Sequence, residues 1–385
     1  MTISKMISKS IEAAKSLEVL VLSSVHPSRD PRIVDKEIRT LAGHGHAVTW
    51  CRPGPVETAS PAPVDVEEIS FPARQGRLRR IFTSWLAARK IINKTRPDIV
   101  HLHDPELLLV GLLPRLPGCR YIYDAHEDIG LQVLAKPWIP GFLRRPVAFA
   151  SNALARLLMR RFDAVITATT DINERLSSLP VQCVTLRNFP RLEQFSVATA
   201  VPEDLVYVGR ISRDRGLEEM LSLAQATGRR LQLAGRVDPA CQAMLDRATS
   251  DGVCDYHGEL DREGVAKLLR GGGIGLCLLH DKVNYRRALP TKLFEYMASG
   301  LPVIVTAFPL WRDIVQAAGA GLAVDLKDGT QGWPEVTRWL ERGALREQGA
   351  AGRRHVETQA SWEQEASALL ALYDELAEGA GGGSG

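Results

Sequence analysis

Several features that would assign a function at once are missing from this 385-residue sequence. It contains no run of about 20 apolar residues, so it predicts no transmembrane helix. Its six cysteines are scattered, without a C-x-x-C pair or a zinc-ligand spacing, which favours reduced, buried thiols and a reducing cytosol. A formal net charge of +3 is too small to argue for a nucleic-acid partner.

Nucleotide-binding fingerprints are absent as well. The sequence has no G-x-G-x-x-G motif and no Walker A loop. The glycines at 271–273 precede an apolar strand, so they are interpreted as a helix terminator. The basic N-terminus lacks the compact apolar core of a signal peptide, and residues 1–16 are expected to form a polar leader. Residues 379–385 are expected to be a flexible tail, because they resemble an engineered linker.

Composition and pattern together predict a two-domain α/β protein. With 45% hydrophobic and 24% charged residues, the chain can bury a sizeable core. Strand and helix patterns alternate over residues 17–197 and again over 198–354. This alternation predicts two Rossmann-like, doubly wound parallel sheets, with ligands at the carboxyl ends of the strands and a central cleft between the domains. A helix over 355–378 is expected to pack back on the first domain.

Residues 289–305 predict a helix that is followed at once by a buried strand. Pro290 marks the start of the helix and Gly300 its end. Free backbone N–H groups and the positive end of the helix dipole can hold a phosphate there. Lys292 and Glu295 lie one turn apart on one helical face, and Glu295 is placed to accept hydrogen bonds from sugar hydroxyls. An ordinary surface helix is the alternative.

Arginines follow the first strand of the second block. Residues 208–217 contain Arg210, Arg213 and Arg215 in a loop at the carboxyl end of that strand. Guanidinium groups match phosphate geometry and can stabilise the charge that develops on a departing nucleoside diphosphate. A solvated loop, neutralised by nearby acidic residues such as Asp214, is the alternative interpretation.

The first block has two strand ends that are rich in histidine and acidic residues, over 101–106 and 123–128. Both should face the same crevice, and His101 is interpreted as structural. Histidine with Asp and Glu is also a donor set for a divalent metal, but the spacing fits no recognised metal motif. The loop 28–32 should border the same crevice, where its charges contact an acceptor or Asp30 caps the following helix.

Basic residues are interleaved with apolar ones over 74–80 and 144–161. Such faces can rest on anionic lipid headgroups. Ordinary solvated helix faces are the more common explanation of the same pattern. The sequence therefore leaves open a peripheral contact with an anionic membrane.

Taken in order, the motifs resemble the GT-B glycosyltransferases of family 4. The segments that carry this resemblance are 98–106, 123–126, 208–210 and 290–300, and it covers nearly the whole chain. It implies retaining, metal-independent transfer of a sugar from a nucleotide donor that is held mostly by the second domain, with no cofactor. UDP-sugars are favoured as donors, with GDP-sugars next.

Site residues follow from the same resemblance, motif by motif. It implies that His126 lies beside the reacting sugar of the donor and that Arg210 meets the diphosphate. Arg215 stands where many members have lysine. Glu295 matches the second glutamate of the family's paired motif, which is assigned to the ribose. The first glutamate should fall eight residues earlier, and Arg287 occupies that position, so the group that usually handles the donor sugar's hydroxyls differs here.

The remaining candidates complete the two sides of the predicted site. On the donor side, Lys292 is expected to contact phosphate directly, next to Gly209 and Thr291. The acceptor-side candidates are Asp30, Arg32, His103, Asp104 and Glu127. Stabilisation of the leaving group by Arg210, Arg215, Lys292 and the helix N-terminus would support front-face attack through an oxocarbenium-like transition state.

The sequence thus predicts a cytoplasmic glycosyltransferase acting on a cell-surface polysaccharide, a lipid-linked or a small-molecule acceptor, with peripheral contact at the inner face of the membrane left open. One alternative is a catalytically weak nucleotide-sugar-binding subunit, which Arg287 favours. The other is a non-hydrolysing sugar-nucleotide epimerase, which shares the architecture. Incubation of a nucleotide sugar without acceptor separates them, because an epimerase converts the nucleotide sugar and a transferase leaves it mostly intact.

Overall fold

The computed structural model of the protein describes residues 16–55, 66–73, 76–125, 129–134, 136, 139–199, 203–326 and 333–381. The chain forms two compact units, the first made of Met1–Arg187 with Glu365–Gly385 and the second of Asn188–Gln364. The sequence placed this division later, between residues 197 and 198. Helix α15 (Trp362–Gly381) starts in the second unit and ends in the first, and it continues into the predicted flexible tail as far as Gly381.

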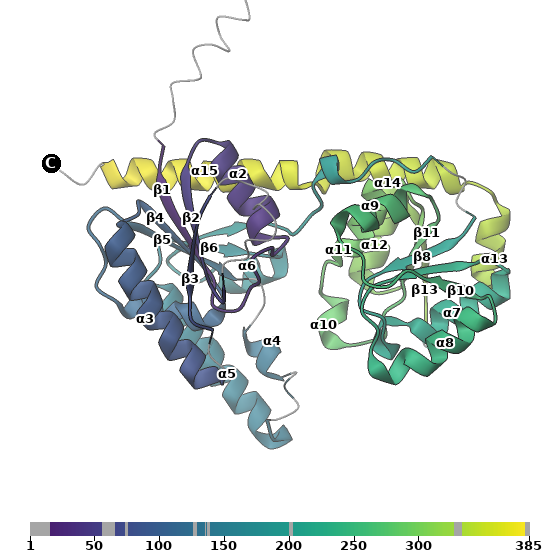
Figure 1. The fold of residues 1–385 in the computed structure, drawn as a ribbon, viewed down its shortest axis with the longest axis horizontal. Coiled ribbons are helices and arrows are strands. Elements are labelled where there is room, and N and C mark those ends of the chain that lie inside the picture. The colour runs from purple at the N-terminus through teal and green to yellow at the C-terminus, as the bar shows by residue number, and fades with distance from the viewer. Residues whose placement is uncertain are drawn as a thin grey trace, which may run out of the picture. The chain divides into compact units, whose positions relative to one another are not determined.

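The described residues of the first unit contain a seven-stranded parallel sheet in the order β3-β2-β1-β4-β5-β6-β7 (Figure 1). Its strands are β1 (Glu18–Leu22), β2 (Ala47–Pro53), β3 (Glu67–Phe71), β4 (Ile99–His103), β5 (Arg120–Ala125), β6 (Ala164–Thr167) and β7 (Gln182–Thr185). The strand order changes direction between β1 and β4. In open parallel sheets, ligands bind outside the carboxyl ends of the strands at such a point.

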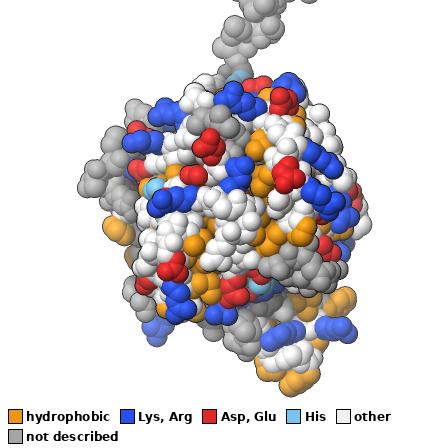
Figure 2. Space-filling model, turned by 90° about the vertical axis from the view of Figure 1, so that its right-hand side faces the viewer, with side chains coloured by type: hydrophobic (Ala, Val, Ile, Leu, Met, Phe, Trp, Pro, Cys, Tyr) orange, Lys and Arg blue, Asp and Glu red, His pale blue; other side chains and the backbone are white. Residues whose placement is uncertain are grey.

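Helices cover both faces of this sheet. They are η1 (Ile33–Ile38), α2 (Arg39–Gly43), α3 (Arg77–Thr95), η2 (Pro105–Leu112), α4 (Ile129–Leu134), α5 (Gly141–Met159) and α6 (Thr170–Leu176). Val100 and Leu102 of β4 join the core that lies under α3, η2 and α5. Because side chains alternate along a strand, His101 and His103 lie on the opposite face, where Tyr373 of α15 packs against His101. Helix α5 reaches the lower end of the first unit in Figure 1, and Figure 2 shows that end from another side.

The described part of the second unit contains a six-stranded parallel sheet in the order β10-β9-β8-β11-β12-β13. Its strands are β8 (Leu205–Val208), β9 (Leu231–Ala234), β10 (Cys254–Tyr256), β11 (Ile274–Cys277), β12 (Val303–Thr306) and β13 (Gly321–Val324). Alternate residues of β8 enter separate cores on the two faces of the sheet, Val206 and Val208 on one and Leu205 and Tyr207 on the other. The order changes direction between β8 and β11, which makes the carboxyl ends of these strands the expected ligand position.

The helices of the second unit connect these parallel strands. They are η3 (Leu192–Gln194), η4 (Arg213–Arg215), α7 (Leu217–Thr227), η5 (Pro239–Cys241), α8 (Gln242–Ser250), α9 (Arg262–Arg270), α10 (Val283–Arg286), α11 (Thr291–Ala298), α12 (Pro309–Ala318), α13 (Trp333–Glu341) and α14 (Leu345–Gln359). The predicted architecture of two Rossmann-like parallel sheets is therefore confirmed. Among the residues that the structure describes, no helix is long and apolar enough to cross a membrane.

Two local features differ from the sequence prediction. Strand β3 was missed, because it is an edge strand whose alternate residues stay partly exposed and give a weak hydrophobic signal. The predicted helix over 106–114 is a 3₁₀ segment, η2, that begins at Pro105. The predicted irregular connection over 52–65 is described only at its start, where β2 continues to Pro53.

Candidate functional site

The carboxyl end of β8 leads into a turn that fixes Arg215. The guanidinium is half-buried next to the side chains of Tyr207 and Tyr285. Burial opposes the charge of Arg215, but the interactions of the guanidinium with Tyr207, and after it with Tyr285, raise the pKa of Arg215 above its usual value. The Tyr207 hydroxyl also donates to the backbone oxygen of Arg210 at 2.8 Å. Arg215 is therefore a fixed, permanently charged cation at the switch point of the second sheet.

Helix α11 brings a second cation and a carboxylate to the same place. Lys292 Nζ lies 2.7 Å from Glu295 Oε2, and the two side chains are 31% and 21% exposed. Burial raises the pKa of the Cys277 thiol, at the end of β11, to about 12, and the charged groups that act on this thiol are Lys292, Glu295 and Arg215. The structure thus brings three of the predicted donor-side residues together around the carboxyl end of β11.

The N-terminus of α11 and the turn before it hold two further predicted residues. Thr291 is the first residue of the helix, after Pro290 at the cap position. Arg287 follows α10 and is exposed. The neighbouring Ala288 oxygen accepts a 2.8 Å hydrogen bond from the buried indole of Trp311, which anchors the connection between α10 and α11.

Arg210 and Gly209 lie directly after β8. The Arg210 side chain is 61% exposed and forms a 3.0 Å ion pair with Asp238. Gly209 has a φ of +150°, and a Cβ on Gly235 would lie 2.0 Å from the Gly209 oxygen. The ends of β8 and β9 therefore approach one another too closely for a side chain at Gly235, and Arg210 is left on the surface beside them.

A pocket of about 550 Å³ opens at the carboxyl ends of β11, β12 and β13. Its walls include His280, Thr306 and Arg312. The Thr306 hydroxyl donates to the Leu279 oxygen at 2.9 Å, and His280 Nε2 lies 2.8 Å from a carboxylate oxygen of Glu219. Cavities of this size suit small-molecule ligands, and this one lies at the same edge of the sheet as the donor-side residues.

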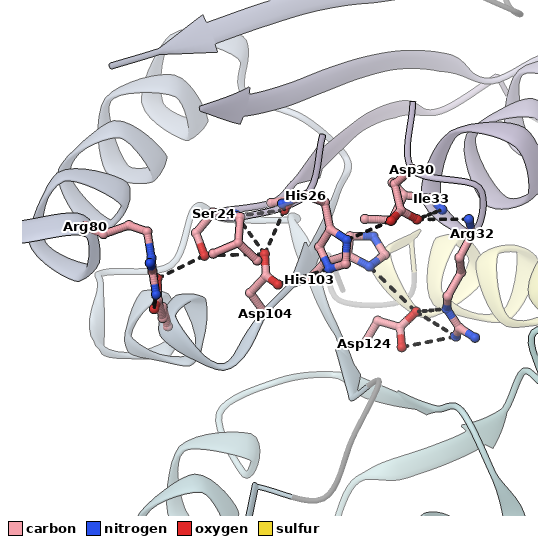
Figure 3. A network of polar contacts seen from close by, with 12 residues as sticks. Ser24, His26, Asp30, Arg32, Ile33, Arg80, His103, Asp104 and Asp124 are labelled. Atoms are coloured by element: carbon pink, nitrogen blue, oxygen red, sulfur yellow. Dashed lines mark hydrogen bonds and ion pairs between the residues drawn. The ribbon is translucent and has the colours of Figure 1, made fainter. Parts of the chain in front are cut away.

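In the first unit, a chain of polar contacts crosses the carboxyl ends of β1, β4 and β5 (Figure 3). His26 lies between two carboxylates, with Nδ1 2.8 Å from Asp30 and Nε2 3.2 Å from Asp104. Burial alone would lower the pKa of this imidazole, but the hydrogen bonds and charges of Asp104 and Asp30 raise the pKa of His26 to about 10. His26 is therefore a cation at neutral pH.

Asp104 adopts an unusual backbone conformation at the end of β4. Its φ is +81°, which non-glycine residues rarely adopt. Its Oδ2 accepts hydrogen bonds from the Ser23 hydroxyl at 2.7 Å and from the Ser24 N–H at 2.8 Å. Strained residues of this kind persist where the surroundings fix them, and they gather at functional sites.

A second group of charges lies deeper, around Arg32. Its Nη2 lies 2.9 Å from Asp124 Oδ2 and its Nε 3.0 Å from Glu37 Oε1, and Nη1 donates to the Leu186 oxygen at 2.9 Å. Burial, followed by the charge of Asp124, raises the pKa of Glu37 well above its usual value against the opposing charge of Arg32. One guanidinium, that of Arg32, is therefore shared by two carboxylates, those of Asp124 and Glu37.

His103 completes this buried group. It is fully buried, with Nε2 3.4 Å from Glu37 and Nδ1 3.7 Å from Asp124. The ligand atoms of His101, His103, Glu37 and Asp124 lie within 4.8 Å of one another, a grouping that could hold a metal ion. Arg32 contacts both carboxylates, so we interpret the group as a charge network that fixes the ends of β4 and β5. His101, predicted to be structural, has Nδ1 3.0 Å from the Tyr373 hydroxyl.

Two predicted residues, His126 and Glu127, lie outside the described residues. Of the acceptor-side candidates, Asp30 and Asp104 both contact His26, whereas Arg32 and His103 belong to the deeper group. His26 was not predicted from the sequence, although it lies in the same loop as Asp30. Glu37 was not predicted either, because its position inside a helical pattern gives no sign of its contacts with β4 and β5.

Comparisons with known proteins agree with this geometry. Residues 32–188 match the family model of the glycosyl transferase 4-like domain, and residues 202–341 match that of glycosyl transferases group 1. No curated protein sequence matches the chain significantly.

Solved structures share the fold at low sequence identity. Sucrose-phosphate synthase from Thermosynechococcus elongatus is 18% identical with a TM-score of 0.67, over 93% of this chain and 99% of that one. A glycosyltransferase from Rickettsia africae is 14% identical with a TM-score of 0.70, over 94% and 99%. HepE from Anabaena, in complex with UDP, is 10% identical with a TM-score of 0.65, over 93% and 100%. The two family models and the shared GT-B fold establish that the chain belongs to the family 4-like glycosyltransferases.

Proposed function

We propose that this glycosyltransferase moves a sugar from a nucleotide-sugar donor, with a UDP-sugar favoured and a GDP-sugar next, and that the transfer retains the anomeric configuration. The observation that carries the proposal is the gathering of Arg215, Lys292 and Glu295 around the end of β11. Two cations suit a diphosphate, and the carboxylate suits sugar hydroxyls. The UDP complex of a structural relative favours uridine as the base.

The leaving group of the reaction is a nucleoside diphosphate, which gains negative charge as the glycosidic bond breaks. Arg215 is held by two tyrosines and needs no rearrangement to meet this charge, and Lys292 and the N–H groups at the start of α11 add to it. Because protein cations supply this stabilisation, the proposal requires no metal and no cofactor. His126 is proposed to lie beside the reacting sugar, and Arg210 to reach the diphosphate after exchanging its partner Asp238.

The acceptor is proposed to bind at the ends of β1 and β4 in the first unit. His26 and Asp30 are partly exposed there and can contact glycan hydroxyls, while the buried Arg32 and His103 hold the strand ends in position. Polysaccharide, lipid-linked and small-molecule acceptors all offer such hydroxyls. Glu127 is proposed to contribute to the same acceptor-binding side of the site. The proposal places the protein in the cytoplasm, with peripheral contact at an anionic membrane.

A transfer assay tests the proposal. The protein is incubated with UDP-glucose and a panel of glycan and lipid-linked acceptors, and the anomeric configuration of the product is read by NMR. An α-linked product from the α-linked donor supports retaining transfer, and an inverted product contradicts it. Conversion of the donor without acceptor would favour an epimerase. Donor binding without turnover on any acceptor would favour the binding subunit, to which the Arg287 replacement points.

A further inference from the structure

The outward face of α5 is apolar, although the helix lies on the surface of the first unit. Its inward face packs Ala148, Ala155 and Leu158 into the unit. On the other side, Phe142 is 81% exposed and Phe149 is 79% exposed. These two residues are seven positions apart, which is close to two helical turns, so their rings lie on the same face.

Other apolar side chains extend this exposed face. Within α5, Leu154 is 54% exposed and Leu157 is 59% exposed. Helices α3 and α5 both pack against η2, and these neighbours add the exposed residues Phe82, Leu86 and Leu112. Large apolar side chains exposed in such numbers on neighbouring helices indicate a site of contact with a protein or a membrane. We refer to these residues, with Phe142 and Phe149, as the apolar ridge.

The charge of the same helices identifies the partner. Helix α3 carries six Lys and Arg residues, and residues 141–161, which comprise α5 and the two arginines after it, carry five. Neither segment contains an Asp or a Glu, although the whole chain has a net charge of only +3. Exposed residues among these cations include Arg89, Arg145 and Arg160. In Figure 2, orange hydrophobic and blue basic side chains lie together at the lowest part of the molecule.

A surface that is both apolar and cationic fits one partner well. We propose that the apolar ridge docks the first unit on a bilayer leaflet that contains anionic phospholipids, with Phe142 and Phe149 inserted at the headgroup boundary and the arginines against the lipid phosphates. A second copy of this chain is a poorer occupant, because α3 and residues 141–161 carry eleven Lys and Arg residues and no Asp or Glu, so the two positively charged faces would repel one another. A neutral apolar partner would leave these charges without a counterpart.

Docking of this kind favours a lipid-linked acceptor over a soluble one. A lipid-linked acceptor is confined to the leaflet, and a protein held on that leaflet meets it at a high effective concentration. The docking assigns a surface to the membrane contact of the proposed function and does not depend on sugar transfer, whereas the choice of acceptor rests on the proposed transfer. The partner and the acceptor can therefore be tested separately.

Vesicle binding tests the docking directly. Full-length protein is sedimented with vesicles of phosphatidylcholine alone or of phosphatidylcholine with phosphatidylglycerol. Wild type is expected to bind the anionic vesicles at low salt, with binding weakened by added salt because the attraction between exposed charges is screened. Phe142→Ser with Phe149→Ser should weaken binding about tenfold or more at every salt concentration, because the apolar contribution is lost. Arg145→Gln with Arg160→Gln should weaken it by about tenfold at low salt and less at high salt.

Matched variants on the second unit control for general changes in charge and hydrophobicity. These are Val197→Ser, at a half-exposed valine, and Arg346→Gln with Arg354→Gln on α14. Both should bind vesicles as wild type does, and all variants should keep the wild-type thermal midpoint because the replaced side chains are exposed. Failure of wild type to bind anionic vesicles, or wild-type binding by the phenylalanine variant, overturns the proposal. A dimer that the phenylalanine variant abolishes would assign the ridge to a second copy instead. UDP binding, measured in parallel, reports on the proposed function alone.

Discussion

The ammonium group of Lys292 lies 2.7 Å from the carboxylate of Glu295, three residues further along α11. The pair holds, in the free protein, the two side chains proposed to meet the donor's phosphate and ribose. Both are partly exposed, so the ion pair itself contributes at most about 1 kcal/mol to stability. Its role is to keep a cation and a carboxylate in place until the donor replaces their mutual contact.

Lys292→Gln should weaken UDP binding about tenfold to a hundredfold, because a charge-assisted contact to phosphate is worth roughly 1.5–3 kcal/mol. The free energy of unfolding should change by less than about 1 kcal/mol. Isothermal titration with UDP and urea denaturation measure the two effects. Lys267→Gln, at an exposed lysine of α9, is the control and should bind UDP normally. Unchanged UDP affinity in Lys292→Gln would remove this residue from the donor site.

Arg215→Ala should lower kcat by about 10²–10³, because it removes one fixed donor of charge stabilisation from the transition state. Arg215→Lys should recover part of this loss, since the charge stays and the geometry changes. Steady-state kinetics with the donor and a working acceptor make the comparison. Arg213→Ala provides the control, because this side chain is 62% exposed and pairs with Glu218. Equal kcat values for Arg213→Ala and Arg215→Ala would contradict the assigned role.

Gly216 fixes the turn that carries Arg215. Its φ is +78°, and a Cβ there would lie 1.8 Å from the backbone oxygen of Leu278. Gly216→Ala should therefore lower the free energy of unfolding by about 3 kcal/mol or more, through backbone strain and a clash with rigid backbone. Gly228→Ala has a similar φ of +66° but no atom within 4 Å of the added carbon, so it should cost only about 1 kcal/mol. Equal losses in denaturant titrations would show that the contact with Leu278 is unimportant.

His26 gives the first unit a pH-dependent stability. The pKa of its imidazole is raised to about 10 in the folded protein, so its stabilising effect is fully present below the ordinary pKa of 6.5 and is lost as the pH rises through 10. His26→Gln should therefore cost about 2 kcal/mol at pH 6, where it removes a charged hydrogen-bonding partner of Asp30 and Asp104, and less at pH 9 to 10. Urea denaturation across this range measures the difference. An equally large cost at both ends of the range would contradict the charged state assigned to His26, and His44→Gln serves as an exposed control.

The features that sequence alone predicted well are those with a strong local signal. The helix Thr291–Ala298 was expected between Pro290 and Gly300, because proline and glycine mark its ends. The buried strands of both sheets were also expected, since their apolar runs are continuous. Strand β3 was not, because an edge strand with half-exposed residues lacks that pattern.

Contacts between distant parts of the chain could not be read in advance. His26 and Asp104 are far apart in sequence, and they meet only because β1 and β4 are neighbours in the sheet. Glu37 similarly reaches His103 of β4, which is distant in sequence, from its position on η1. The fixed position of Arg215 depends on Tyr285, which comes from α10 and carries no motif of its own.

A thermal-shift screen tests the central claim most directly. Wild type, Glu295→Ala and the exposed control Glu335→Ala are each heated with UDP, GDP, ADP or dTDP. A nucleotide that binds only the folded protein raises the midpoint by mass action. We expect UDP to raise the midpoint of wild type and of the control, and we expect this rise to be lost in Glu295→Ala. No rise with any nucleotide in wild type, or an equal rise in Glu295→Ala, would contradict a nucleotide-sugar site at α11.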